Sequence, residues 1–220
     1  QYDQFLLKAV RVDVENLVCS DQQKTENILK KALNSAFFIN EDNLLNDIKQ
    51  NIPCASELKV TRLFPDRISI KVLGDVPILS IFSQAYSQEA TPSANFLVSQ
   101  NGLVIISQYP PKDLPKVSYL GSLSTGQTIE NDYAKKVKKI IDYLAYLNIT
   151  AEFIQLSIDG KLKIIDGGGL VILFQLTKDV DVQLASLQLI LNQAKIETQE
   201  VKSIDLRFDR PTVINAPIKK

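Results

Sequence analysis

The chain contains no histidine, and this absence removes whole classes of chemistry. Ser-His-Asp and Cys-His catalysis, histidine-ligated zinc and imidazole proton transfer all require that side chain. The two cysteines do not suffice for a tetrahedral thiolate metal site on their own. A hydrolase built on paired carboxylates is the enzyme class that this composition leaves open.

The chain also lacks net charge, because 25 basic residues balance 25 acidic ones. A protein that binds nucleic acid by neutralising phosphates needs a basic excess on some face. No basic cluster interleaved with aromatic residues occurs in the sequence. We therefore expect no nucleic-acid partner.

Methionine is absent too, even from the first position, so we expect a fragment or a processed form of a longer protein. There is no run of 18 or more apolar residues that would span a membrane, and no signal peptide at the start. A membrane anchor would therefore precede Gln1. With 45% hydrophobic residues in 220, the chain has enough apolar material for two modest folded domains.

The carboxylates nearest to turns are the candidates for acid–base chemistry: Asp159, Asp166, Asp179 and Asp181. The pairs Asp159-Gly160 and Asp166-Gly167 each interrupt an apolar alternation, which is typical of hairpin turns. The glycine run after Asp166 is not followed by the Lys-Ser/Thr of a phosphate-binding loop. We therefore predict no catalytic, cofactor-binding or metal-binding residues.

The first 77 residues predict a small α+β domain. Alternating apolar residues predict a strand over Phe5–Val14, and Ser20 with Gln23 forms a capping box that opens a helix. Asn40 caps a second helix that ends before Pro53. A hairpin then turns at Phe64–Arg67, so the order of elements is β-α-α-β-β.

Residues 78–215 predict a second, mostly antiparallel β domain with two helices, followed by a disordered tail over 216–220. Asn101-Gly102 predicts a hairpin turn, and residues 153–176 predict a three-stranded meander. The first helix carries lysines at 135, 136, 138 and 139, which favour a solvated face over a membrane or nucleic-acid surface. The second helix covers residues 180–191, and Ser203–Phe208 forms the final strand.

Two motifs about 140 residues apart resemble a known family. The hairpin Leu58–Val72 and the ending Ser203–Phe208 (SIDLRF), which follows a leucine-rich helix, are similar to the extracytoplasmic region of the bacterial cell-division proteins FtsQ and DivIB. Leu114–Val117 matches a further segment of that family. The resemblance implies an N-terminal POTRA domain followed by an FtsQ-type β domain.

The resemblance also implies a function. Members of the family are non-enzymatic, single-pass membrane proteins of the division septum, and they bind FtsB (or DivIC) and FtsL to help control septal peptidoglycan synthesis by FtsW and FtsI. Strand addition to the last strand, Ser203–Phe208 with an alternative extension through Thr212-Val213-Ile214, is the expected binding mode. The partner-binding residues expected there are Ser203, Asp205, Arg207, Phe208, Thr212 and Val213.

Each of the two main candidates has an alternative role. Phe208 either anchors a partner or shares the core with Ile204 and Leu206, and Arg207 either pairs with a partner carboxylate or is solvated. Pro211 removes a backbone donor and is expected to shorten or kink the augmented strand. The alternative function is a POTRA-containing transport or assembly module of the outer-membrane type.

In a POTRA-like layout, Cys19 and Cys54 fall at the same edge of the sheet. They form either a disulfide, which suits an oxidising extracytoplasmic location, or two buried thiols. Closing the 35-residue loop would stabilise the fold by about 3–4 kcal/mol. A second partner surface is expected at the edge of the three-stranded sheet near Val60–Leu63.

Overall fold

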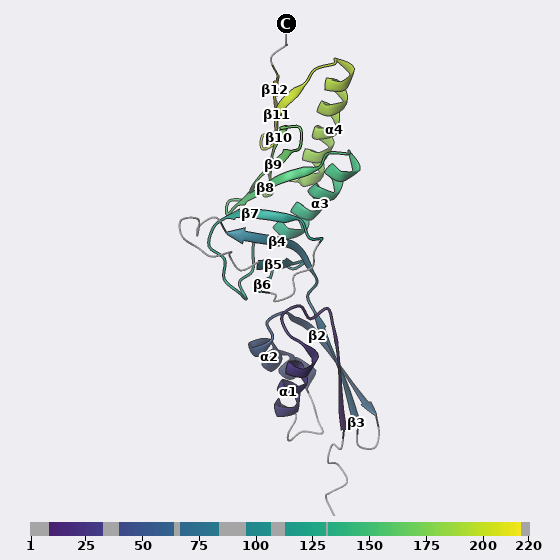
Figure 1. Ribbon diagram of the computed structural model, residues 1–220. Helices are drawn as coiled ribbons and strands as arrows, with labels where there is room; N and C mark the ends of the chain where they lie inside the picture. Colours follow the sequence, from purple (N-terminus) through teal and green to yellow (C-terminus); the bar gives the residue numbers. More distant parts are fainter. Residues whose placement is uncertain are drawn as a thin grey trace, which may run out of the picture.

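The computed structural model describes residues 9–32, 40–63, 67–83, 96–106, 113–130 and 132–216. The described part is an α+β protein with four helices and two sheets, one of three strands and one of nine (Figure 1). The α+β prediction is therefore confirmed. None of the helices in these ranges is both long enough and apolar enough to cross a bilayer.

The small sheet consists of β1 (Ala9–Glu15), β2 (Ala55–Leu63) and β3 (Arg67–Gly74) in the order β1-β3-β2. Strand β3 pairs in parallel with β1 and antiparallel with β2. Alternate residues of β3 are buried, as expected for a strand with one face on the core. The predicted strand from Phe5 begins outside the described residues, as does the hairpin turn at 64–66.

Two helices cover one face of this sheet: α1 (Gln22–Ala32) and α2 (Glu41–Asn51). The predicted cap of α2 is confirmed, because the Asn40 side chain accepts the backbone N–H of Asn43. The predicted cap of α1 was wrong by one residue. Asp21, rather than Ser20, accepts the backbone N–H of Lys24 at 2.7 Å, since a carboxylate one position later reaches the same free donors. We call residues 9–74 the N-terminal unit.

The large sheet has the strand order β12-β11-β10-β9-β8-β7-β4-β5-β6. Five of its eight strand pairs are antiparallel and three are parallel, so the sheet is mixed but mostly antiparallel. We call residues 77–216 the C-terminal unit. Its strands are β4 (Pro77–Ser83), β5 (Phe96–Ser99), β6 (Val104–Ile106), β7 (Lys116–Leu120), β8 (Ala151–Ser157), β9 (Lys161–Asp166), β10 (Val171–Gln175), β11 (Val201–Asp205) and β12 (Thr212–Asn215).

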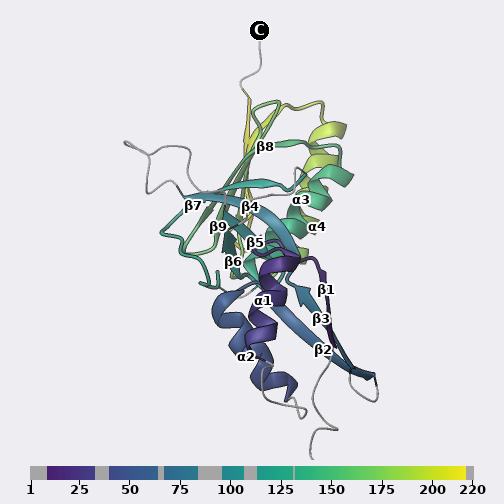
Figure 2. The same ribbon diagram turned by 60° about the horizontal axis from the view of Figure 1, so that its bottom comes forward.

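Helices α3 (Tyr133–Tyr146) and α4 (Val180–Ile196) lie on one face of the large sheet (Figure 2). Val137 and Ile140 on α3, together with Leu187 on α4, are fully buried against it. The opposite face of β8 to β11 has no helix over it in either view. The strands alternate between buried residues toward the helices and half-buried residues on this open face.

The lysine run of α3 is structural and solvent-facing, as predicted. Lys138 pairs with Asp142 and Lys139 pairs with Asp181 of α4, both at 2.6 Å. Lys136 donates to the carbonyl of Leu176 at 2.7 Å. These contacts use the ammonium groups within the fold.

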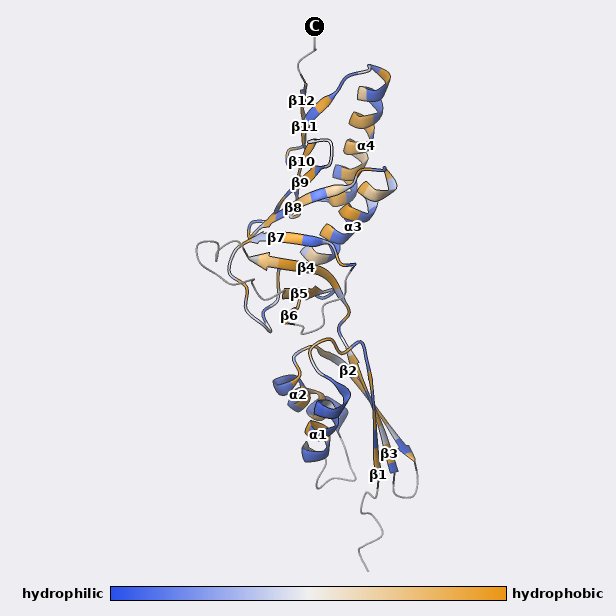
Figure 3. Ribbon diagram, viewed as in Figure 1, coloured by the Kyte–Doolittle hydropathy of each residue, from blue (hydrophilic) through white to orange (hydrophobic). Residues whose placement is uncertain are grey.

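Strand β5 serves two cores at once. Its alternation sends Val98 into the core under α3 and α4, whereas Leu97 points the other way. Leu97 and its cross-strand partner Ile105 are fully buried in a cluster with the N-terminal unit. In Figure 3, β5 is mostly orange, in keeping with this burial from two sides.

Candidate partner-binding edge

The strand predicted to offer a free edge does not do so. Strand β11 ends at Asp205 and lies between β10 and β12, so the edge predicted over Ser203–Phe208 was assigned to the wrong strand. The chain turns back after Asp205 and forms β12, which pairs antiparallel with β11. Thr212 and Val213 therefore do not extend the final strand; they belong to the neighbouring one.

A side chain explains where β11 stops. The Asp205 carboxylate accepts the backbone N–H of Arg207 at 3.1 Å, which closes a local turn that competes with the strand ladder. It also accepts two bonds from the Arg207 guanidinium, at 2.6 and 2.9 Å. The hydrogen bonds from Arg207 lower the pKa of Asp205 and outweigh partial burial, which acts in the opposite direction.

Phe208 lies outside the core. Ile204 and Leu206 are buried, whereas Phe208 is 60% exposed, so the alternative that placed all three in the core was wrong. The Arg207 guanidinium stands 5.6 Å from the centre of the Phe208 ring. A cation over an aromatic face is attracted to it, so this contact holds both side chains at the surface.

Strand β12 is the edge of the large sheet, and all four of its residues are exposed. Leu206 donates its N–H to the carbonyl of Leu173 on β10. The backbone groups of successive residues of β11 therefore face β10 and β12 in turn. The backbone of Asp205 then faces β12 and its opposite residue Thr212, whereas the backbone of Val213 faces outward. Within the described part of the chain, no strand pairs with this side of β12, so Val213 presents a backbone donor and a backbone acceptor to an incoming strand.

A pocket of about 370 Å³ opens on the uncovered sheet face over β8, β9 and β10, and the segment between β11 and β12 reaches it through Arg207. Arg207 lines it together with Leu173, Lys161 and Lys163. Lys161 pairs with Asp159 at 2.6 Å, and this contact with Ser157 nearby lowers the pKa of Asp159 to about 2. Within the described ranges Lys163 has no ion-pair partner, so the pocket offers a cation to an incoming acid.

The other predicted surface is the edge strand β2. It lies at the margin of the small sheet, and Thr61, Arg62 and Leu63 at its end are exposed. Leu63 is 48% exposed. This edge, like β12, has no strand beside it within the described part of the chain.

The turn carboxylates have structural partners. Asp166 accepts the backbone N–H groups of Gly168 and Leu170, and Asp179 caps α4. The interpretation of Asp166 as a turn residue is therefore confirmed. Among the described residues, no group of three or more His, Cys, Asp or Glu side chains forms a metal-binding cluster.

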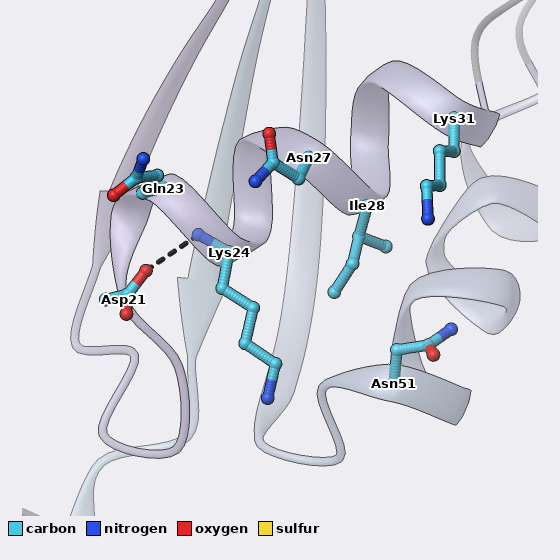
Figure 4. Close-up of a pocket in the computed structure, with 7 residues that line it drawn as sticks. All are labelled: Asp21, Gln23, Lys24, Asn27, Ile28, Lys31 and Asn51. Carbon is cyan, nitrogen blue, oxygen red and sulfur yellow. Dashed lines mark hydrogen bonds between the residues drawn. The ribbon is translucent and has the colours of Figure 1, made fainter.

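Helices α1 and α2 also border a hollow of about 480 Å³, which Figure 4 shows with Lys24, Lys31 and Asn51 around it. Its lining includes one carboxylate, that of Asp21, which accepts the backbone N–H of Lys24. An acid–base pair needs two carboxyl groups across a cleft. The lining of this hollow provides one, and that one is used as a helix cap.

The sulfur atoms of Cys19 and Cys54 are bonded to each other. Cys54 is fully buried, and the bond joins the segment before α1 to the segment before β2. Of the two alternatives for this pair, the structure contains the disulfide. Its placement beside the junction of the two units was not visible in the sequence.

Comparison with known proteins adds no family to these observations. A scan against models of protein families matches no family, and a search of curated proteins finds no match.

The sequence gives no signal for Lys163, and it includes Ile214 only as an extension of the strand Ser203–Phe208, whereas the structure places Ile214 on the separate edge strand β12. Ile214 lies opposite Ser203 and is 57% exposed, on the same open face as Lys163. The turn signal Asp209-Arg210-Pro211 between two alternating segments would have predicted a hairpin here, and with it the correct edge. Lys163 had no such signal, because its proximity to Arg207 arises from the pairing of β9, β10 and β11.

Proposed function

We propose that this chain is a non-enzymatic scaffold of the bacterial division machinery, of the FtsQ/DivIB type, which binds an extended segment of a partner along β12. The observation that supports it is the exposed outer edge of β12. A partner strand would pair with the backbone of Val213, and main-chain hydrogen bonds would supply affinity. Ile214 and Phe208 would supply apolar contact beside that strand.

The pocket at Arg207 and Lys163 supports a second contact. An acidic side chain that precedes or follows the partner strand would meet Arg207 and Lys163. Arg207 already forms a two-point bond with Asp205, so its guanidinium is held in place before binding. The expected ligand is therefore an extended, partly apolar segment with an acidic residue close to it.

The resemblance in sequence names the expected partners: an FtsB- or DivIC-like protein on β12, with FtsL-like and FtsW/FtsI-type proteins in the same assembly. On the same resemblance, we propose that the N-terminal unit is a POTRA domain. We also propose that a segment upstream of the chain anchors the protein to the cell membrane and that both units lie outside the cytoplasm. The β-α-α-β-β order and the sheet order β1-β3-β2 support this proposal. The edge of β2 is the proposed site for a further division protein.

A proline substitution tests the edge. Val213→Pro removes the outward donor but leaves the bonds between β11 and β12 in place, since those come from the flanking residues of β12. We expect it to weaken binding of an FtsB-like extracytoplasmic segment at least about tenfold, through a lost hydrogen bond and a clash of the ring with the incoming strand. Calorimetric titration measures the change.

The matched control is Val213→Ala, which trims a half-exposed side chain and keeps the amide. It is expected to bind within about threefold of the wild type, because little apolar area is lost. Far-UV circular dichroism of both variants checks that they fold alike. If proline and alanine weaken binding equally, or if neither does, the partner does not add a strand at β12.

The runner-up is an assembly module of the outer-membrane type. Such a module would take the unfolded strands of many substrates at the edge of β2. In the same titration it would bind unrelated strand-forming peptides as tightly as the FtsB-like segment, and Val213→Pro would leave that binding unchanged.

A further inference from the structure

The short connection between the two units, Asp75-Val76, is held by hydrogen bonding and close packing within the N-terminal unit. Asp75 donates its backbone N–H to the carbonyl of Cys54 at 2.8 Å. Gly74, just before it, lies against the segment that follows β1. An added Cβ at Gly74 would stand 2.3 Å from the carbonyl oxygen of Asn16. Asn16 is three residues from Cys19, so both ends of the disulfide lie beside the connection.

Residues of the C-terminal unit form hydrogen bonds to the same connection. Gln100 donates its backbone N–H to the carbonyl of Val76 at 3.2 Å, and the Asn101 side chain donates to the Asp75 carboxylate at 3.0 Å. Leu97 and Ile105 of the β5–β6 hairpin are buried in the same cluster as Cys54. A run of contacts therefore leads from the disulfide through Cys54 and Asp75 to Asn101.

We propose that the Cys19–Cys54 disulfide is a redox-sensitive clamp on the junction, which fixes the angle between the two units. With the bond intact, residues 16–19 are tied to Cys54. Asn16 and Leu17 of this segment lie against Gly74, next to the Asp75 amide that bonds to the Cys54 carbonyl. Reduction by an external dithiol breaks the S–S bond, and two electrons and two protons pass to the two sulfurs as the reductant closes its own disulfide. Residues 16–19 can then move away from Gly74, and the two units reorient.

This inference is separate from strand addition, because β12 makes none of the junction hydrogen bonds, and the exposed residues of β2, Thr61 to Leu63, lie at the opposite end of that strand from Cys54. Its consequence for an assembly is geometric. A partner that holds both sheet edges meets them at a fixed separation in the oxidised protein and at a variable separation in the reduced one. Binding at two sites gains most when the separation is fixed at the right value.

Hydrogen exchange followed by NMR tests the clamp, because the Gln100 amide belongs to the C-terminal unit but bonds to the connection. For each amide, the exchange rate in the reduced protein is divided by the rate in the oxidised protein. This ratio is expected to be at least about tenfold larger for Gln100 than for Ile70. Ile70 lies in the central strand of the N-terminal unit and reports its overall stability. The Leu206 amide, bonded to Leu173 on the far side of the large sheet, should not change.

Residual dipolar couplings give the second readout. One alignment tensor should fit both units in the oxidised protein, and two should be needed after reduction. The double variant Cys19→Ser/Cys54→Ser should reproduce the reduced state without a reductant. Asn101→Asp places a carboxylate against Asp75 and should open the junction with the disulfide intact, which shows what an open junction looks like in both measurements.

Two results would overturn the clamp. If Gln100 and Ile70 lose protection by the same factor, the disulfide stabilises the N-terminal unit in general and has no special effect on the junction. If a single tensor still fits the reduced protein while Asn101→Asp requires two, the packing of Leu97 and Ile105 holds the units together without the disulfide.

Discussion

Gly74→Ala adds one methyl group at the most crowded glycine of the chain. An ideal Cβ there would stand 2.3 Å from the Asn16 carbonyl oxygen and 2.9 Å from the Leu17 Cα. Carbon atoms that are not bonded prefer roughly 3.5 to 4.0 Å, so the two backbone segments must separate by about 1 Å. Both neighbours are backbone atoms and cannot swing away as a long side chain would.

The expected cost is about 1–3 kcal/mol of unfolding free energy for the N-terminal unit, the usual range for overpacking. The disulfide keeps the cost at the upper end, because Cys19 restrains the segment that has to move. In the Cys19→Ser/Cys54→Ser background the segment relaxes, and we expect the cost of Gly74→Ala to fall by about half. Such non-additivity is typical of neighbouring sites that share a contact.

Guanidinium unfolding followed by far-UV circular dichroism measures these free energies from the midpoint and slope. The matched control is Gly167→Ala, whose Cβ would meet the end of the flexible Glu152 side chain at 3.0 Å. That variant should unfold within about 0.5 kcal/mol of the wild type, or be stabilised slightly. The reasoning is refuted if Gly74→Ala and Gly167→Ala unfold alike, or if removal of the disulfide leaves the Gly74→Ala cost unchanged.

Further predictions concern the second unit. Because hydrogen bonds from Arg207 lower the pKa of Asp205, the stability that this pair contributes is present above the unfolded pKa of about 3.9 and is lost as the pH falls through the folded value. Acid unfolding of Asp205→Asn should lack this component, and an NMR titration of the Asp205 carboxyl carbon should give the lowered pKa directly. Phe174→Ala empties a fully buried site and should cost about 3–5 kcal/mol in chemical unfolding. Phe208→Ala, at a 60% exposed site, should weaken partner binding in calorimetry while changing the unfolding free energy by less than about 0.5 kcal/mol.

Much of the fold follows from local signals. The order of elements in the N-terminal unit, the Asn101-Gly102 hairpin, the meander after residue 151 and both helices of the C-terminal unit were predicted from periodicity and turn residues. In each case one short segment carries its own signal, such as Asn40 at the start of α2. The α+β class follows from these elements together.

What the sequence did not predict depends on pairing between distant segments. Strands β4 and β7 lie inside the large sheet. The middle residues of β7 are buried on both faces, which removes the alternation that marks a strand, and β4 carries the apolar residues Ile78 and Phe82 on its half-buried face as well. The sequence predicts residues 212–214 as an extension of the strand before them, because the turn after Asp205 depends on a side-chain hydrogen bond that no local pattern announces. The pocket at Arg207 and Lys163 likewise exists only once β9, β10 and β11 have paired.

The two-sided use of β5 affects how this protein can be divided. Leu97 and Ile105 belong to the C-terminal unit in the chain but are buried in the cluster of the N-terminal one. A fragment cut before residue 77 would expose both side chains as a new apolar patch, and such patches favour self-association. Polar replacements at these two positions would be needed before the C-terminal part could serve alone as a binding reagent. The same replacements in the intact chain would weaken the attachment between its halves.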